Sequence, residues 1–212
     1  MIVKVSNKDK LYKKDNFDFK PNEINVLVGP NGTGKTQLIK RLKDNFEKEN
    51  TLYASYSNFE NGGKYATDKF LFYGKQDALI ASVFHSEGQQ MYSNFANIFL
   101  SDMQGVLKKE SLKNSPRDTI WLLVDAMDSG FDIPHNREII NLFNLILKKE
   151  KERSPFLKDI YILVSANTYE YVKDREVLDV FTGKWLSFKD YDDYANHIIK
   201  TKEKIDKRDK KE

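Results

Sequence analysis

The chain has 212 residues, of which 40% are hydrophobic and 13% aromatic, so it can form one domain with a sizeable core. It contains no cysteine, which excludes disulfides, zinc–thiolate sites and cysteine nucleophiles, and its net charge of +3 is too small to indicate a nucleic-acid-binding protein. No apolar stretch is long enough to span a membrane and the N-terminus lacks a signal-peptide pattern, so we expect a cytoplasmic protein with no membrane partner.

In chain order, short apolar runs alternate with segments of helical periodicity. Strands are predicted at residues 2–5, 24–28, 52–56, 120–124 and 160–164, followed by a hairpin of 177–181 with 185–188. Helices are predicted directly after residue 37, within 75–115, over 135–150, and after the hairpin. This alternation predicts an α/β fold with a mostly parallel sheet that is covered on both faces.

The whole chain, 1–212, is expected to be a single domain. Residues 75–115 would form a helical lobe, in which Met91, Phe95, Phe99, Met103 and Val106 fall on one face. Residues 200–212 are polar and basic, but acidic residues interrupt every basic run. That mixture is more typical of a solvated helix end than of a contact surface.

The most informative motif is Gly-Pro-Asn-Gly-Thr-Gly-Lys-Thr at residues 29–36, between the strand at 24–28 and a helix. It fills every required position of GxxxxGK[ST], the phosphate-binding loop of nucleoside triphosphatases. Its glycines allow backbone N–H groups to turn toward a polyphosphate, and the following helix adds the positive end of its dipole. Lys35 can reach the β- and γ-phosphates, and the Thr36 hydroxyl can bind Mg²⁺. The motif predicts binding of a nucleoside triphosphate.

A carboxylate follows the apolar strand at 120–124. Asp125 stands at the carboxyl end of this strand, where ligands bind in parallel sheets. In phosphate-loop proteins such a carboxylate holds Mg²⁺ opposite the threonine of the loop. A polar turn residue would explain Asp125 equally well if it stood alone, but the loop upstream favours the Mg²⁺ role.

A third motif is His-Ser-Glu-Gly-Gln at residues 85–89, before a predicted helix. Ser86 and Gln89 have the spacing of a capping box, which is a purely structural explanation. The motif also resembles Leu-Ser-Gly-Gly-Gln, the signature of ABC-type ATPases, because Ser86, Gly88 and Gln89 match. His85 and Glu87 depart from it.

Together these motifs resemble the small ABC-type ATPases of phages and other mobile elements, which are related to the heads of SMC, RecF and OLD-type proteins. Residues 125–130, 164–167 and 188–194 add to the resemblance, which spans nearly the whole chain. It implies an ABC-type ATPase head with a small N-terminal antiparallel part and a short helical lobe. It also implies a homodimer that holds ATP between its subunits, in which Asp128–Asp132 corresponds to the D-loop at the dimer interface.

Two positions depart from the ABC pattern. The glutamate that polarises the attacking water is replaced by Ala126, whose methyl group can neither accept a proton nor orient water. Hydrolysis is therefore slow, or another residue such as Asp128 substitutes, or the alanine is an engineered change. The switch histidine is also missing, and Asn167 in that region can hydrogen-bond a γ-phosphate but cannot shuttle a proton.

Two further assignments, the Mg²⁺-contacting glutamine and the residues that stack on the base, have less support in the sequence. Gln76 is the candidate for the Mg²⁺-contacting glutamine, although an exposed surface glutamine explains it better. The aromatic residues Tyr12, Phe17 and Phe19 are more typical of strand packing than of a base-stacking platform.

The predicted site comprises three sets of residues: catalytic Lys35, Asp128 and Asn167; ATP-binding Pro30, Asn31, Gly32, Thr33, Gly34, Lys35, Thr36, Gln37, Ser86, Gly88 and Gln89; and Mg²⁺-binding Thr36, Asp125 and Gln76.

The main functional hypothesis is an ATP-dependent homodimer that acts as a clamp or switch in DNA transactions or phage–host conflict, with DNA or another protein as its partner. The alternative is a non-hydrolysing ATP sensor whose dimer presents a surface to a protein partner. A small-molecule kinase would use the same loop, but the signature-like motif argues against it.

Overall fold

The computed structural model describes residues 1–58, 87–127 and 131–210, without the side chains of residues 87–94 and 209. Its strands are β1 (Ile2–Lys4), β2 (Asn16–Asp18), β3 (Ile24–Val28), β4 (Tyr53–Ser57), β5 (Thr119–Asp125), β6 (Asp159–Ser165), β7 (Val177–Asp179) and β8 (Lys184–Leu186). Its helices are α1 (Lys35–Lys48), α5 (Glu87–Ser111), α6 (Ile133–Arg153) and α7 (Tyr191–Asp209), with a short 3₁₀ turn η1 (Tyr169–Tyr171).

The sheet is mostly parallel, as the alternation of strands and helices predicts. Its six strands have the order β4-β5-β6-β3-β7-β8, and only the pair β7–β8 is antiparallel. Strands β1 and β2 form a separate antiparallel pair, which is the expected small N-terminal part. The prediction of an α/β fold with these two parts is confirmed.

Each central strand contributes side chains to both faces of the sheet because successive residues of a strand point in opposite directions. In β5, Ile120, Leu122 and Val124 belong to the cluster on the side of α5 and α6. Trp121 and Leu123 belong to the cluster on the side of α1. This arrangement explains why the strand is apolar throughout rather than alternating.

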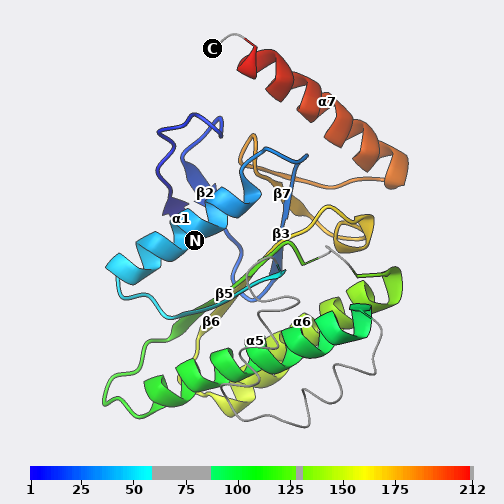
Figure 1. Cartoon of the computed structure of the whole chain (residues 1–212). Coiled ribbons are helices and arrows are strands. Elements are labelled where there is room, and N and C mark those ends of the chain that lie inside the picture. The colour runs from blue at the N-terminus through cyan, green and yellow to red at the C-terminus, as the bar shows by residue number, and fades with distance from the viewer. Residues whose placement is uncertain (59–86, 128–130, 211–212) are drawn as a thin grey trace.

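The helices cover both faces of the sheet. In Figure 1, α5 and α6 lie side by side on one face and α1 lies on the other. Phe95, Phe99 and Met103 of α5 are buried, which confirms the predicted apolar face for these three residues. Among the helices as described, none combines the length and the apolar character that crossing a membrane requires.

The C-terminal elements differ in detail from the prediction. Strand β7 ends at Asp179 rather than at residue 181, because the Asp179 carboxylate accepts hydrogen bonds from Phe181 N (3.2 Å) and Thr182 Oγ1 (2.6 Å) and closes a turn. Helix α7 continues to Asp209 and buries Thr201 and Ile205, so part of the segment expected as a polar tail packs against the domain.

Candidate functional site

The loop between β3 and α1 depends on its glycines. Gly29, Gly32 and Gly34 have φ values of 149°, 88° and 87°, which side-chain-bearing residues rarely adopt. A Cβ atom on Gly29 would lie 2.8 Å from Thr33 Oγ1, and one on Gly34 would lie 3.0 Å from the Tyr12 ring. The loop can close this tightly only with glycine at both positions.

The N-terminus of α1 follows this loop without a side-chain cap. Its N-cap residue, Gly34, cannot supply a capping oxygen, and its first turn contains no acidic residue. The other two helices whose caps are described, α6 and α7, are capped by Asp132 and Asp190. The first N–H groups of α1 and the positive end of its dipole therefore face the loop, and together they favour an anion.

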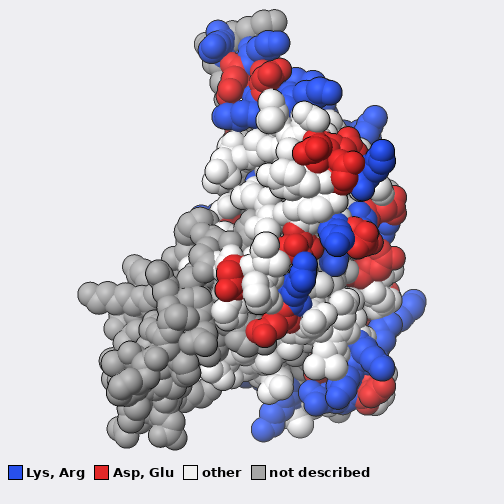
Figure 2. Space-filling model, turned by 90° about the vertical axis from the view of Figure 1, so that its right-hand side faces the viewer, with Lys and Arg blue, Asp and Glu red and all other residues white. Residues whose placement is uncertain are grey.

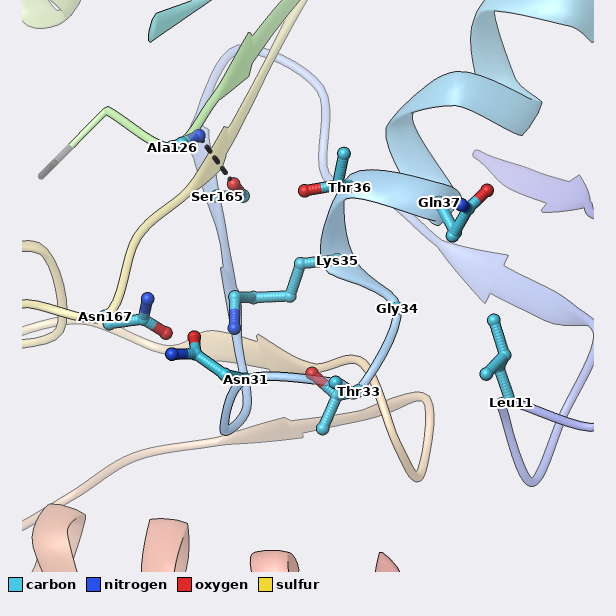
Figure 3. Close-up of a pocket in the computed structure, with 11 residues that line it drawn as sticks. Leu11, Asn31, Thr33, Gly34, Lys35, Thr36, Gln37, Ala126, Ser165 and Asn167 are labelled. Atoms are coloured by element: carbon cyan, nitrogen blue, oxygen red, sulfur yellow. Dashed lines mark hydrogen bonds between the residues drawn. The ribbon is translucent and has the colours of Figure 1, made fainter. Parts of the chain in front are cut away.

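Lys35 lies at the start of α1 and its side chain is turned back over the loop. Its ammonium group donates hydrogen bonds to the carbonyl oxygens of Gly29 (2.5 Å) and Pro30 (3.3 Å). In Figure 3 the Lys35 side chain points toward the space beside Asn31 and Asn167. The loop thus holds a buried cation next to the N–H groups of α1.

Thr36 and Asp125 meet although β3, the strand that leads into α1, is not next to β5 in the sheet. Strand β6 lies between them, and Thr36 Oγ1, at the start of α1, donates to Asp125 Oδ1 at 3.2 Å. Ser165, at the end of β6, donates to the same Asp125 oxygen at 2.5 Å. The Ser165 oxygen also accepts from Ala126 N at 2.9 Å, as the dashed line in Figure 3 shows. The ends of α1, β5 and β6 are joined in this way.

The oxygen atoms of Thr36 and Asp125 fit a Mg²⁺ site. Mg²⁺ binds oxygen ligands octahedrally at about 2.1 Å, so adjacent ligands are roughly 3.0 Å apart. The 3.2 Å between Thr36 Oγ1 and Asp125 Oδ1 is close to that separation. A hydroxyl and a carboxylate are also the oxygen donors that this ion takes beside phosphate groups.

A cavity of about 480 Å³ opens over the loop and Thr36, whereas Asp125 is not part of its described lining. Its described lining consists of Leu11, Asn31, Gly32, Thr33, Gly34, Lys35, Thr36, Gln37, Ala126, Ser165 and Asn167. In Figure 3, Asn31 and Asn167 lie close together at one end, whereas Leu11 and Gln37 lie at the other. The polar end, the cation and the helix N-terminus suit a chain of phosphate groups, and Leu11 adds apolar surface at the opposite end.

The structure brings together most of the predicted residues that it describes. Pro30 belongs to the loop and the other predicted residues between 31 and 37 line the cavity, as does Asn167. Gly88 and Gln89 lie in the first turn of α5, where the side chains are not described, and Gln76, Ser86 and Asp128 lie outside the described residues. The roles predicted for these five residues therefore stay predictions.

Three contributors were missed from the sequence. Ser165 was recognised only as part of a segment without histidine, and Leu11 was not considered. Tyr12 packs edge-on against Phe17 as expected, with ring centroids 5.3 Å apart, and it also donates its hydroxyl to Gly34 O at 2.9 Å. Burial raises the pKa of Tyr12 to about 12, so this hydroxyl stays protonated. Strand packing also describes Phe17 and Phe19, which are buried and stacked at 6.3 Å.

Ala126 adopts an unusual backbone conformation for its residue type. Its φ is +53°, in the left-handed region that costs a residue with a Cβ atom roughly 1–2 kcal/mol. The hydrogen bond from Ala126 N to Ser165 holds the backbone in this conformation, and Ala126 lines the cavity next to Asp125. This is the position at which the sequence lacks the expected glutamate.

No model of a known protein family matches the chain. The energy-coupling factor transporter ATP-binding protein EcfA1 of Thermotoga maritima is 23% identical over 221 aligned positions, which cover 88% of this chain and 82% of that protein. The hemin import ATP-binding protein HmuV of Pseudoalteromonas translucida is 58% identical over 33 residues, or 16% of this chain and 13% of HmuV. A solved ATP-binding subunit of an ABC transporter is 14% identical, with 87% of this chain and 86% of that chain covered at a TM-score of 0.38. The chain is thus similar in sequence to ATP-binding subunits of ABC transporters.

Proposed function

We propose that the chain is an ABC-type ATPase subunit that binds MgATP in the cavity above the loop at residues 29–36. The observation that carries this proposal is the contact of Thr36 with Asp125 at 3.2 Å, beside the uncapped N-terminus of α1. It puts a Mg²⁺-binding pair next to an anion-binding helix end, at a cavity that Thr36 lines. The sequence similarity to transporter ATP-binding proteins supports the same ligand.

The residues divide the work of binding. Lys35 exchanges its contacts with Gly29 O and Pro30 O for phosphate oxygens, and the N–H groups of the loop and of α1 bind the remaining phosphate oxygens. Thr36 and Asp125 hold Mg²⁺, which neutralises phosphate charge when bound. Gln37 lies at the end of the cavity that is lined by Leu11 and would face the nucleoside.

Hydrolysis is expected to be slow because the cavity wall at Ala126 has no group that can accept a proton from water. Asn167 is exposed and lines the cavity, so it can hydrogen-bond the terminal phosphate without acting as a base. Apart from Asp125, which is assigned to Mg²⁺, Asp128 is the nearest carboxylate in sequence to Ala126, and it remains the candidate that could replace the missing glutamate.

We further infer that two copies of the chain enclose ATP between them. The signature-like motif Ser86–Gln89 would then contact the nucleotide of the other subunit, and the pair would contain two equivalent sites. The resemblance to ABC-type ATPases supports this arrangement.

Such a dimer would act as a clamp or switch. The resemblance to ABC-type ATPases of mobile elements supports a role in DNA transactions or phage–host conflict. A sensor that binds ATP without hydrolysing it is the second candidate, and the methyl group of Ala126 favours it. The relatives EcfA1 and HmuV are named as transport and import proteins, so they lend no support to the expectation of no membrane partner. A membrane protein therefore joins DNA and soluble proteins among the partners to be tested.

Thermal unfolding with and without MgATP tests the ligand. A ligand at 100 times its Kd stabilises a protein by about 2.7 kcal/mol, so MgATP should raise the Tm of the native chain. Lys35→Ala should abolish this rise, whereas Lys48→Ala, on the exposed last turn of the same helix, should keep it. Equal shifts for all three proteins would refute binding at this loop.

Light scattering with a non-hydrolysable ATP analogue tests the dimer. The mass should double with the analogue and Mg²⁺, and Ser86→Arg should prevent the doubling without changing the analogue's Kd. A monomer at all concentrations of an analogue that demonstrably binds would contradict the dimer but not the nucleotide site.

A further inference from the structure

A second cavity, of about 340 Å³, lies between the loop that joins β1 and β2 and the C-terminal helix α7. Its described lining is Lys10, Tyr12, Lys13, Phe181, Lys204 and Arg208. These residues come from the loop that joins β1 and β2, from the turn after β7, and from the C-terminal half of α7. Figure 1 shows that end of α7 above the β1–β2 loop.

Four of the six lining residues are cations and none is a carboxylate. Two acidic residues nearby in sequence pair with other cations: Asp9 with Arg41, and Asp206 with Lys202 at 2.9 Å. Within the part of the chain that the structure describes, Lys10, Lys13 and Lys204 form no ion pair. Three of the four cations at the cavity thus have no ion-pair partner among the described residues, and the cavity gathers positive charge.

Specific contacts hold this arrangement in place. Arg208 donates to the carbonyl oxygens of Lys10 (3.0 Å) and Leu11 (3.2 Å), which fixes α7 against the β1–β2 loop. The Lys13 ammonium group lies over the Phe181 ring, 5.2 Å from its centroid. Tyr12 and Phe181 are buried and form the floor. The cations thus surround a hollow that has a rigid aromatic base.

We propose that this cavity is a second phosphate-binding site, which takes a compact oligophosphate anion. Lysine and arginine side chains that line a hollow from two segments, the β1–β2 loop and α7, can bind several phosphate groups at once through charge-assisted hydrogen bonds. The anion can be a free inorganic oligophosphate or the phosphate tail of a nucleotide, since both present the same groups.

The surroundings favour a compact anion over a nucleic acid. The aromatic rings of Tyr12 and Phe181 are buried, so they offer little surface on which bases could stack. Figure 2 includes the C-terminal end of α7 at its top, and on this face basic and acidic side chains are interspersed rather than gathered into a basic track.

The second cavity shares a wall with the loop cavity. Leu11 lines the loop cavity while its carbonyl oxygen accepts from Arg208, and Tyr12 bonds to Gly34 O of the loop. An anion that draws on Arg208 changes the contacts of this shared wall. Binding at one cavity should therefore change affinity at the other, by the same factor in both directions.

Calorimetric titration with inorganic tripolyphosphate, in Mg²⁺-free buffer, tests the site. The titration uses the Lys35→Ala protein, in which the loop site is disabled, so the result does not depend on the proposed ATPase function. We expect one equivalent to bind, with an affinity that falls as salt is added. Adding Lys13→Gln and Lys204→Gln should weaken binding about tenfold or more, since each substitution removes a charge-assisted hydrogen bond to phosphate.

The matched control adds Lys200→Gln and Lys207→Gln to Lys35→Ala; both residues are exposed on α7 and absent from the cavity lining. This protein loses the same charge and should bind tripolyphosphate as before. Equal weakening in both multiple variants, or no binding to Lys35→Ala, would overturn the proposal.

Two further titrations of Lys35→Ala identify the source of the anion. ATP that binds more tightly than tripolyphosphate would assign the site to nucleotides, and equal or weaker binding of ATP would assign it to free oligophosphates. A third outcome is that a single-stranded oligonucleotide binds, while tripolyphosphate neither binds nor displaces it. This result would overturn the proposal of a compact-anion site and would indicate a nucleic-acid-binding surface.

Discussion

The Ser165 hydroxyl donates to Asp125 Oδ1 at 2.5 Å while its oxygen accepts from Ala126 N at 2.9 Å. One serine therefore orients the proposed Mg²⁺ carboxylate and also pairs the N–H group of the residue where the general base is missing. Ser165 is the last residue of β6, and β6 lies between β3 and β5 in the sheet. Ser165 therefore lies between the ends of these two strands.

Replacing this serine tests its structural role. Ser165→Ala leaves Ala126 N without its partner and removes a donor from the buried Asp125, so unfolding free energy should fall by about 1–3 kcal/mol. Ser111→Ala, in which an exposed hydroxyl is removed from the end of α5, should change it by less than about 0.5 kcal/mol. Urea unfolding measures the unfolding free energy of both variants. An equal loss in Ser165→Ala and Ser111→Ala would show that Ser165 has no particular structural role.

The Mg²⁺ assignment predicts a specific loss in Asp125→Asn. The asparagine keeps the shape but not the charge, so ATP should still raise the Tm while the extra rise caused by Mg²⁺ disappears. Titration of Mg²⁺ at fixed ATP gives the measurement. Asp118→Asn, at an exposed site before β5, is the control and should retain the full Mg²⁺ effect; unchanged Mg²⁺ dependence in Asp125→Asn would place the ion elsewhere.

A glutamate at position 126 should accelerate ATP turnover. General-base catalysis typically contributes ~10²–10⁴-fold, so Ala126→Glu should raise kcat well above that of Ala126→Gln, which has the same length and no basic group. If the native chain already hydrolyses ATP rapidly and Asp128→Asn abolishes that activity, Asp128 is the base. If neither substitution alters turnover, the sensor function is favoured.

Because Ala126 has a left-handed backbone conformation, replacing it by glycine should stabilise the protein, whereas replacing an alanine inside a helix by glycine destabilises it. Ala126→Gly should raise the unfolding free energy by up to about 1 kcal/mol, because glycine adopts a φ of +53° without the steric cost of a Cβ atom. Ala195→Gly, in the interior of α7, should lower it by about 1 kcal/mol. Thermal unfolding distinguishes the two signs.

Glu110 should make stability depend on pH. Its buried carboxylate bonds to Arg117 Nη2 (2.5 Å) and Lys113 Nζ (2.8 Å), and these contacts, Arg117 first, lower its pKa from 4.5 to about 2. The stabilisation is complete above pH 4.5 and is lost as pH falls toward 2.

Glu110→Gln should therefore be less stable than the native protein by ~2–3 kcal/mol at pH 7, and the two should converge near pH 2. Glu203→Gln, on the exposed surface of α7, should follow the native curve. A constant difference between Glu110→Gln and the native protein at all pH values would contradict the assignment.

The sequence predicted those parts of the site that follow one another along the chain. The loop at 29–36 and the carboxylate after the strand at 120–124 are local patterns, and the structure brings Thr36 and Asp125 together as expected. Ser165 could not be predicted in the same way. Its role follows from the position of β6 between β3 and β5, and strand order is not written in any single segment.

Tyr12 illustrates a second limit. Its spacing from Phe17 and Phe19 is compatible with packing, and all three aromatic residues do pack in the core. The hydrogen bond from Tyr12 to Gly34 O joins residues 22 positions apart in a loop without periodicity, so no pattern indicates it. The cavity formed with α7 is equally invisible in the sequence, because Arg208 and Lys10 are 198 residues apart.

The strand order also determines when the loop site can exist during synthesis. Strand β3 pairs with β6 on one side and with β7 on the other, and Asn25 and Ile162 are 137 residues apart. At about 5–20 residues per second, a ribosome needs roughly 7–30 s to make that stretch. Until then the strand that precedes the loop has neither neighbour, so a nascent chain arrested before β6 should be unable to retain nucleotide.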